Sequence, residues 1–135
     1  MTLRVTPLTG EEIGPALPAL ARLRIAVFRD WPYLYDGSLA YEEKYLAKLA
    51  AAQGAVVVAA YDGEEIIGCA TAAPMAEVEA ELAVPFRQHG MDPARIFYCG
   101  ESVLLPAYRG RGLGHAFFDH REAVSYTHLT LPTKA

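Results

Sequence analysis

The chain has 135 residues, of which 53% are hydrophobic, and a formal net charge of −4. This length and composition predict one compact domain with its own core and argue against a second domain. The acidic balance argues against nucleic-acid binding, which normally needs a basic surface. Because the sequence has no bilayer-length apolar run and no secretory apolar segment at its start, we expect a cytoplasmic protein without a membrane partner.

The chain opens with a pattern typical of a strand and then a helix. Residues 3–7 favour a strand, and Thr9 with Glu12 three positions later has the form of a capping box. An apolar stripe at three- and four-residue spacing continues to Phe28, although two prolines interrupt its first turns. The sequence therefore predicts a helix that ends near Asp30.

Residues 38–51 predict a second helix. Tyrosines and leucines recur on one side of it, and charged residues, Glu42 among them, fall on the other. We expect the charged side to face solvent.

The middle of the chain predicts a hairpin, a helical segment and a further strand. Residues 55–61 and 65–72 each favour a strand. The Asp62-Gly63 turn between them is a strong hairpin signal. Residues 76–88 are acidic and modestly helical, and residues 96–105 are rich in strand formers. The cysteines at 69 and 99 have no partner at metal-ligand spacing, so we expect buried free thiols and no metal.

The most informative segment follows this last strand and the proline at 106. It reads Arg109-Gly110-Arg111-Gly112-Leu113-Gly114 and then turns helical. A helix start presents unpaired backbone N–H groups, glycines let a pyrophosphate approach them, and arginines can bind its oxygens. The Gly-Lys-Ser/Thr ending of a P-loop and the third glycine of a dinucleotide fingerprint are both missing here. The pattern predicts an anion cradle; the alternative is a simple mobile turn.

The cradle resembles the acetyl-CoA motif of the GNAT family of N-acetyltransferases, Gln/Arg-x-x-Gly-x-Gly/Ala, at Arg109, Gly112 and Gly114. The preceding proline and the aromatic Tyr108 fit the same motif. The resemblance covers residues 1–124. It implies an α/β fold with a mixed, mostly antiparallel sheet flanked by helices.

The resemblance also implies a reaction: an amine attacks the thioester of acetyl-CoA directly, with no covalent enzyme intermediate. Glu101, the one carboxylate of the last predicted strand, is our candidate base. The alternative is an ion-paired structural role, possibly with Arg109, and the general acid stays unassigned. The co-substrate would be held by the backbone of Ser102, Val103 and Leu104 beside pantetheine, and by Arg109, Gly110, Arg111, Gly112, Leu113 and Gly114 around the pyrophosphate.

In the family, the loop between the first two helices influences acceptor choice. Here it carries Trp31, Tyr33 and Tyr35, which could line an amine pocket with an aspartate nearby to attract the cation. The alternative is an aromatic plug over the core, with Asp36 capping the second helix. The resemblance suggests a small-molecule or peptide amine as acceptor.

Residues 125–135 depart from the family pattern, with no acidic residue and no helical stripe. We expect a non-family tail in place of the family's C-terminal half; the alternative is a native short strand. The loss would leave a strand edge near residues 103–105 open and Leu113 and Phe117 without partners. We therefore expect an inactive, poorly folded chain. Two other readings are an acyl-CoA-binding or regulatory module without turnover and a truncated product without function.

Overall fold

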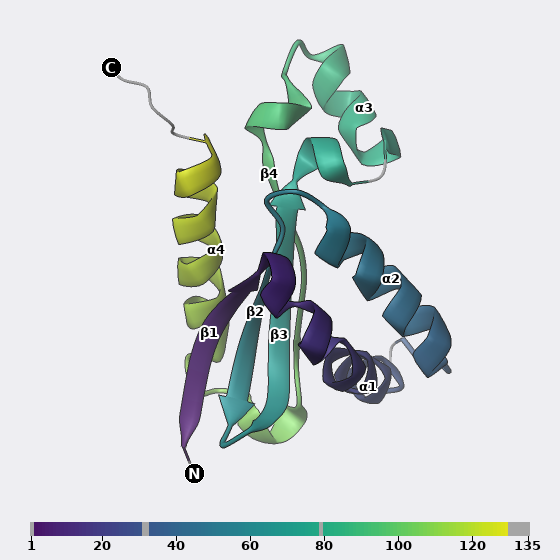
Figure 1. Cartoon of the computed structure of the whole chain (residues 1–135), viewed down its shortest axis with the longest axis vertical. Coiled ribbons are helices and arrows are strands. Elements are labelled where there is room, and N and C mark those ends of the chain that lie inside the picture. The colour runs from purple at the N-terminus through teal and green to yellow at the C-terminus, as the bar shows by residue number, and fades with distance from the viewer. Residues whose placement is uncertain (1, 31–32, 79, 130–135) are drawn as a thin grey trace.

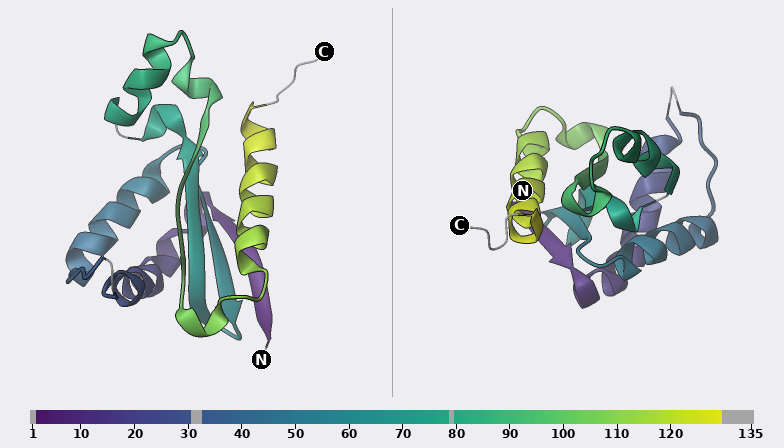
Figure 2. Two further views of the ribbon diagram at one scale, coloured as in Figure 1. Left: turned by 180° about the vertical axis from the view of Figure 1, so that it is seen from behind. Right: turned by 90° about the horizontal axis from the view of Figure 1, so that it is seen from above.

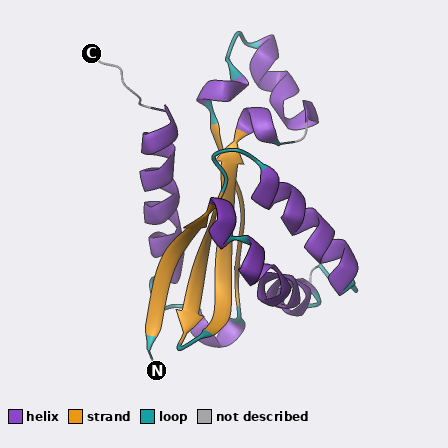
Figure 3. Ribbon diagram, in the orientation of Figure 1, coloured by secondary structure: helices purple, strands orange, loops and turns teal. Residues whose placement is uncertain are grey.

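The protein is described by a computed structural model that covers residues 2–30, 33–78 and 80–129. Four antiparallel strands form one sheet in the order β1-β2-β3-β4, with helices on both faces (Figures 1 and 3). This confirms the predicted fold class and order of elements. The elements are β1 (Leu3–Thr9), α1 (Leu17–Phe28), α2 (Leu39–Ala51), β2 (Val56–Asp62), β3 (Glu65–Pro74), α3 (Ala80–Gln88), β4 (Phe97–Leu104) and α4 (Leu113–Leu129).

Local signals account for the start of α2 and for the turn that follows β1. The side chain of Ser38 accepts the backbone N–H of Tyr41 at 3.1 Å and so caps α2, which rules out the alternative of a cap by Asp36. The backbone N–H of Thr9 donates to the carboxylate of Glu12 at 2.9 Å, as in a capping box. That motif opens only a short 3-10 turn, and a second 3-10 turn that contains Pro15 precedes α1, which begins at Leu17.

The core has two layers because both faces of the central strands are covered. α1 and α2 pack on one face and α4 packs on the other, as Figure 2 shows. Val57 faces α1 and α2, whereas Val56 and Val58 face Phe117 of α4. Phe117 is 1% exposed, and burying such a side chain contributes about 1.5–3 kcal/mol.

Four expectations from the sequence are wrong. Leu113 and Phe117, expected to lack partners, are buried against the sheet. Glu42, expected to face solvent, is 1% exposed. Cys99 is exposed, and only Cys69 is a buried thiol. Residues 125–129 continue α4 although no helical stripe was expected there. The domain boundary proposed at residue 124 stays a prediction, and residues 130–135 lie outside the described residues.

A β-bulge in β4 interrupts its pairing with β3. Ala70 pairs with Ser102 and Ala72 pairs with Cys99, so two residues of β4 face Thr71 alone. The two residues are Gly100 and Glu101. A bulge bends the strand and redirects its side chains, and here it includes Glu101, the predicted base.

No helix in the described part of the chain is long and apolar enough to cross a membrane.

Candidate active site

The start of α4 has the shape of an anion site. Gly110 and Gly112 have φ values of +78° and +80°, where other residues are strained. A Cβ atom at Gly114 would have no neighbour within 4 Å, so the first turn of the helix is open. Its leading backbone N–H groups have no partner within the helix, and the helix dipole adds partial positive charge. A phosphate group therefore fits here against bare backbone.

The arginines of this turn bind the chain's own carbonyls. Arg109 donates from Nε and Nη2 to the carbonyl of Leu104 at 3.2 and 3.0 Å. Arg111 donates from Nη2 to the carbonyl of Ala107 at 3.4 Å, and its Cζ lies 5.7 Å from the ring centroid of Tyr108. Arg109 thus ties the cradle to the end of β4, a contact that the sequence did not predict.

Tyr108 fastens the other side of the cradle. Its hydroxyl donates to Oδ2 of Asp62, in the β2–β3 hairpin, at 2.6 Å. This hydrogen bond, together with burial, raises the pKa of Tyr108. The backbone N–H of Leu105 also donates to the carbonyl of Ile67 at 3.0 Å. The turn that carries the glycines is therefore held against the sheet at several points.

The bulge of β4 is held by Thr71 and Arg121. Oγ1 of Thr71 accepts the backbone N–H of Glu101 at 3.0 Å, and a Cβ atom at Gly100 would lie 2.7 Å from that oxygen, so glycine permits the approach. From α4, Nη1 of Arg121 donates to the carbonyls of Thr71 and Glu101, both at 3.4 Å, and Nη2 donates to Oγ of Ser102 at 3.0 Å. Arg121 is 2% exposed, so these contacts are shielded from water.

On the opposite face of the sheet, Arg24 of α1 lies between two carboxylates. Its Nε forms an ion pair with Oε1 of Glu42 in α2, and its Nη1 forms one with Oε2 of Glu101. The side chains of Arg24, Glu42 and Glu101 are 8%, 1% and 34% exposed. The hydroxyl of Tyr35 donates to Oε2 of Glu42 at 2.7 Å, and this bond raises the pKa of Tyr35.

Aromatic rings complete the surroundings of Arg24. The ring centroids of Phe28 and Tyr45 lie 5.2 and 4.6 Å from its Cζ, within cation–π range. The guanidinium is thus held by rings as well as by carboxylates. Of the three ionised groups in the cluster, Glu101 is the most open to solvent.

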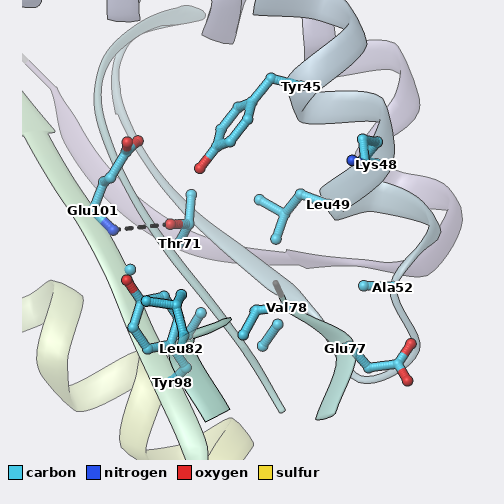
Figure 4. A pocket seen from close by; sticks show the side chains of 13 residues that line it. Tyr45, Lys48, Leu49, Ala52, Thr71, Glu77, Val78, Leu82, Tyr98 and Glu101 are labelled. Carbon is cyan, nitrogen blue, oxygen red and sulfur yellow. Dashed lines mark hydrogen bonds between the residues drawn. The ribbon is translucent and has the colours of Figure 1, made fainter. Parts of the chain in front are cut away.

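Two cavities meet at Glu101. The larger, of about 460 Å³, lies between α2, the paired ends of β3 and β4, and the segment around α3 (Figure 4). The carboxylate of Glu101 and the hydroxyl of Tyr45 lie at one end of this cavity. The smaller, of about 400 Å³, is lined by Arg24, Phe28, Tyr33, Tyr35, Tyr41, Glu42 and Glu101.

The structure thus brings together some of the predicted residues. Glu101 has an ion-pair partner, but that partner is Arg24, whereas Arg109 bonds to the Leu104 carbonyl. Tyr33 and Tyr35 line the smaller cavity, and Trp31 lies outside the described residues.

Sequence reasoning missed Arg24, Glu42, Thr71 and Arg121. Charge at positions 24 and 121, amid apolar helix faces, was an available signal for the two arginines. Nothing local marked Glu42 or Thr71. Among the described residues, no group of three or more His, Cys, Asp or Glu could hold a metal ion.

A family of known proteins matches most of this chain. The model of the acetyltransferase (GNAT) family matches residues 20–128. No curated protein matches the chain.

The fold recurs in solved acetyltransferases. Aminoglycoside N-acetyltransferase AAC(6')-Iy in complex with CoA has a TM-score of 0.65 at 14% identity, over 93% of this chain and 70% of that chain. The same enzyme with the bisubstrate analogue CoA-S-monomethyl-acetylneamine gives 0.64 at 15%, over 94% and 74%. A ribosomal-protein-alanine N-acetyltransferase from Brucella melitensis biovar Abortus 2308 gives 0.59 at 12%, over 95% and 74%. At these identities the likeness concerns the fold.

Proposed function

This chain belongs to the acetyltransferase (GNAT) family, and on that premise we propose that it transfers the acetyl group of acetyl-CoA to the amine of a small molecule. The observation that carries the proposal is the short path between an anion cradle and a carboxylate. Glu101 lies three residues before Leu104, whose carbonyl is bound by Arg109 of the cradle. One segment therefore offers a phosphate site and a base.

The co-substrate fits the cradle on this chain's own geometry. The open start of α4 suits a pyrophosphate, with Gly110, Gly112, Leu113 and Gly114 supplying backbone and the two arginines adding positive charge. Pantetheine would run along the backbone of Ser102 and Val103. The Leu104 carbonyl already accepts two N–H groups of Arg109, which fixes the end of that path.

The chemistry then needs one base. An ammonium acceptor must lose a proton before its nitrogen attacks the thioester carbonyl, forming the C–N bond as the C–S bond breaks. The carboxylate of Glu101 takes that proton, directly or through a water. Arg24 and the bulge hold it in place from two directions: the guanidinium binds its carboxylate, and Thr71 binds its backbone N–H. The second amine proton leaves with the CoA thiol.

The acceptor reaches Glu101 from the α1–α2 side of the sheet, where both cavities open. The aromatic loop contributes Tyr33 and Tyr35 to the wall of the smaller cavity, and we keep these two, with Trp31, as acceptor-side residues. Related folds in AAC(6')-Iy and other N-acetyltransferases support a small amine as the acceptor.

Mass spectrometry of the amine products tests the proposal. The 135-residue chain is incubated with acetyl-CoA and a panel of amines, and each amine is examined for a gain of one acetyl group. Loss of thioester absorbance gives the rate; a thiol reagent is unsuitable because Cys99 is exposed. Enzyme-dependent acetylation supports acetyl transfer. CoA binding without acetylation of any amine contradicts it and favours a CoA-binding module.

A further inference from the structure

The larger cavity carries information about the acceptor. Figure 4 shows Glu101 at one end and Glu77 toward the other, with the side chains of Leu49, Val78 and Tyr98 on the wall between them. Its volume of about 460 Å³ is within the range of small-molecule sites. The wall is mainly aliphatic and aromatic, whereas the ionisable groups stand apart.

The charges in this cavity are few. Its described lining residues include two carboxylates, Glu77 and Glu101, and one ammonium, Lys48. An oxygen of Glu77 already accepts the backbone N–H of Gln53 at 3.2 Å. The described lining thus carries one net negative charge (one ammonium against two carboxylates), and ammonium groups beyond the first would lie against leucine and valine, where a charge loses its hydration without gaining a partner.

The smaller cavity is less suited to a cation. It contains the guanidinium of Arg24, which does not line the larger cavity, and its most buried carboxylate, Glu42, is already bound by Arg24 and Tyr35. Glu101 lines both cavities and is itself paired with Arg24. An ammonium there would meet a like charge and a satisfied carboxylate. The body of an amine bound at Glu101 is therefore better placed in the larger cavity, and Tyr33 and Tyr35 then border only its ammonium end at Glu101.

Resting on the acetyl transfer proposed above, we propose that the acceptor is a primary amine with a single ammonium group and an apolar body. The ammonium lies at Glu101, and the body occupies the larger cavity against Tyr98, Val78 and Leu82. Such an amine buries apolar area where the wall is apolar and presents its one charge where a carboxylate stands. Polycationic amines such as aminoglycosides and polyamines are disfavoured.

The test compares three probe amines at equal concentration: 2-phenylethylamine, spermidine and kanamycin. We expect kcat/KM for 2-phenylethylamine to be higher than for either polycation by about tenfold or more, as a matching apolar pocket allows. Preference for spermidine or kanamycin overturns the proposal about the cavity, yet leaves acetyl transfer standing.

A matched pair of variants on α3 locates the effect. Leu82 lines the cavity and is 40% exposed, whereas Val84 is 44% exposed and does not line it. Leu82→Glu should lower the ratio of kcat/KM for 2-phenylethylamine to kcat/KM for spermidine by about tenfold or more, because it adds a carboxylate to the wall. Val84→Glu should leave the ratio unchanged. Equal shifts in both variants contradict the proposal.

A binding measurement distinguishes two outcomes: an amine that does not bind in the larger cavity, and an amine that binds there but is not acetylated. If no amine is acetylated, saturation-transfer NMR with 2-phenylethylamine and CoA still reports on the cavity. Contact signals that weaken in Leu82→Glu and persist in Val84→Glu uphold the acceptor site while acetyl transfer fails. Absence of contact signals in the parent chain overturns the acceptor site itself.

Discussion

Two buried arginines hold β4 from opposite faces, and they do so in different ways. Arg24 lies on the α1–α2 side between the carboxylates of Glu42 and Glu101. Arg121 lies on the α4 side and, among the described residues, binds two backbone carbonyls and the hydroxyl of Ser102, with no hydrogen-bond partner at Nε. One arginine positions a side chain, and the other positions the backbone that carries it.

Arg24 therefore compensates charge, whereas Arg121 fixes backbone geometry. Removing Arg24 leaves carboxylates without their counter-charge, whereas removing Arg121 leaves neutral carbonyls without a donor. A buried unpaired charge costs more than a buried unpaired carbonyl. The two arginines should therefore differ in how strongly their loss affects stability.

The largest effect on stability is expected for Arg24→Met. The substitution leaves Glu42, which is 1% exposed, as an unpaired buried carboxylate, so the unfolding free energy should fall by about 3–5 kcal/mol. Urea denaturation measures this. Arg22→Met, at an exposed position of the same helix, should change it little. The double variant Arg24→Met, Glu42→Gln should recover much of the loss; a double variant no more stable than Arg24→Met alone would contradict the charge argument.

Glu101→Gln should act on the reaction rather than on binding. The amide keeps the size of the side chain but cannot take a proton, so turnover should fall by about a hundredfold or more. CoA affinity, measured by isothermal titration, should stay close to that of the parent. An unchanged rate across the pH profile would remove Glu101 from its role as base.

Arg121→Met should have a smaller effect on stability than Arg24→Met. It leaves the carbonyls of Thr71 and Glu101 short of a donor, which costs about 1–3 kcal/mol, but it also removes a buried charge that no described carboxylate compensates. Urea denaturation of the two methionine variants under one condition compares them. A loss equal to or above that of Arg24→Met would show that the charge on Arg121 is compensated in another way.

The smallest effect concerns the two thiols. Burial raises the pKa of Cys69 to about 12 from an ordinary value of 9.0, so a thiol reagent should label Cys99 and spare Cys69 in the folded chain. The unfolded thiol loses its proton first. The associated stability is therefore complete well below pH 9 and lost as the pH rises toward 12, with a loss on the order of 1 kcal/mol between pH 8.5 and 9.5.

Cys69→Ala tests this pH dependence in urea melts. The variant should lose less stability than the parent between pH 8.5 and 9.5, whatever its stability at neutral pH. Equal losses in parent and variant, or labelling of Cys69 at the rate of Cys99, would show that the thiol at position 69 is not shielded.

Features set by neighbouring residues were predictable from the sequence. The Asp62-Gly63 turn predicts the hairpin, and the glycines at 110 and 112 after a strand predict the short turn that opens α4, because both depend on backbone conformation within a few residues. The ion pairs of Arg24 were not predictable in this way. They join α1, α2 and β4, and the charge of Glu42 alone indicates solvent as readily as a buried partner.

The expectations that the chain is inactive and poorly folded stand against the proposed acetyl transfer, and the acetylation assay and the urea melts decide between them. One of their two physical grounds has gone, because Leu113 and Phe117 are packed against the sheet. The other remains, since β4 pairs with β3 alone among the described strands. After Val124, serine and threonines replace the apolar stripe, so the sequence there carries little helical signal. Nevertheless, α4 continues to Leu129.

The central claim is that acetyl-CoA binds at the open start of α4, and Gly114 provides its most direct test. A side chain at this position meets open space, and an aspartate in the first turn favours the helix, so Gly114→Asp should fold at least as well as the parent. Isothermal titration with CoA should show binding weakened about a hundredfold in Gly114→Asp, because a carboxylate then faces the pyrophosphate, and about tenfold or less in the uncharged control Gly114→Asn. CoA affinity in Gly114→Asp equal to that of the parent would place the co-substrate elsewhere and contradict the account.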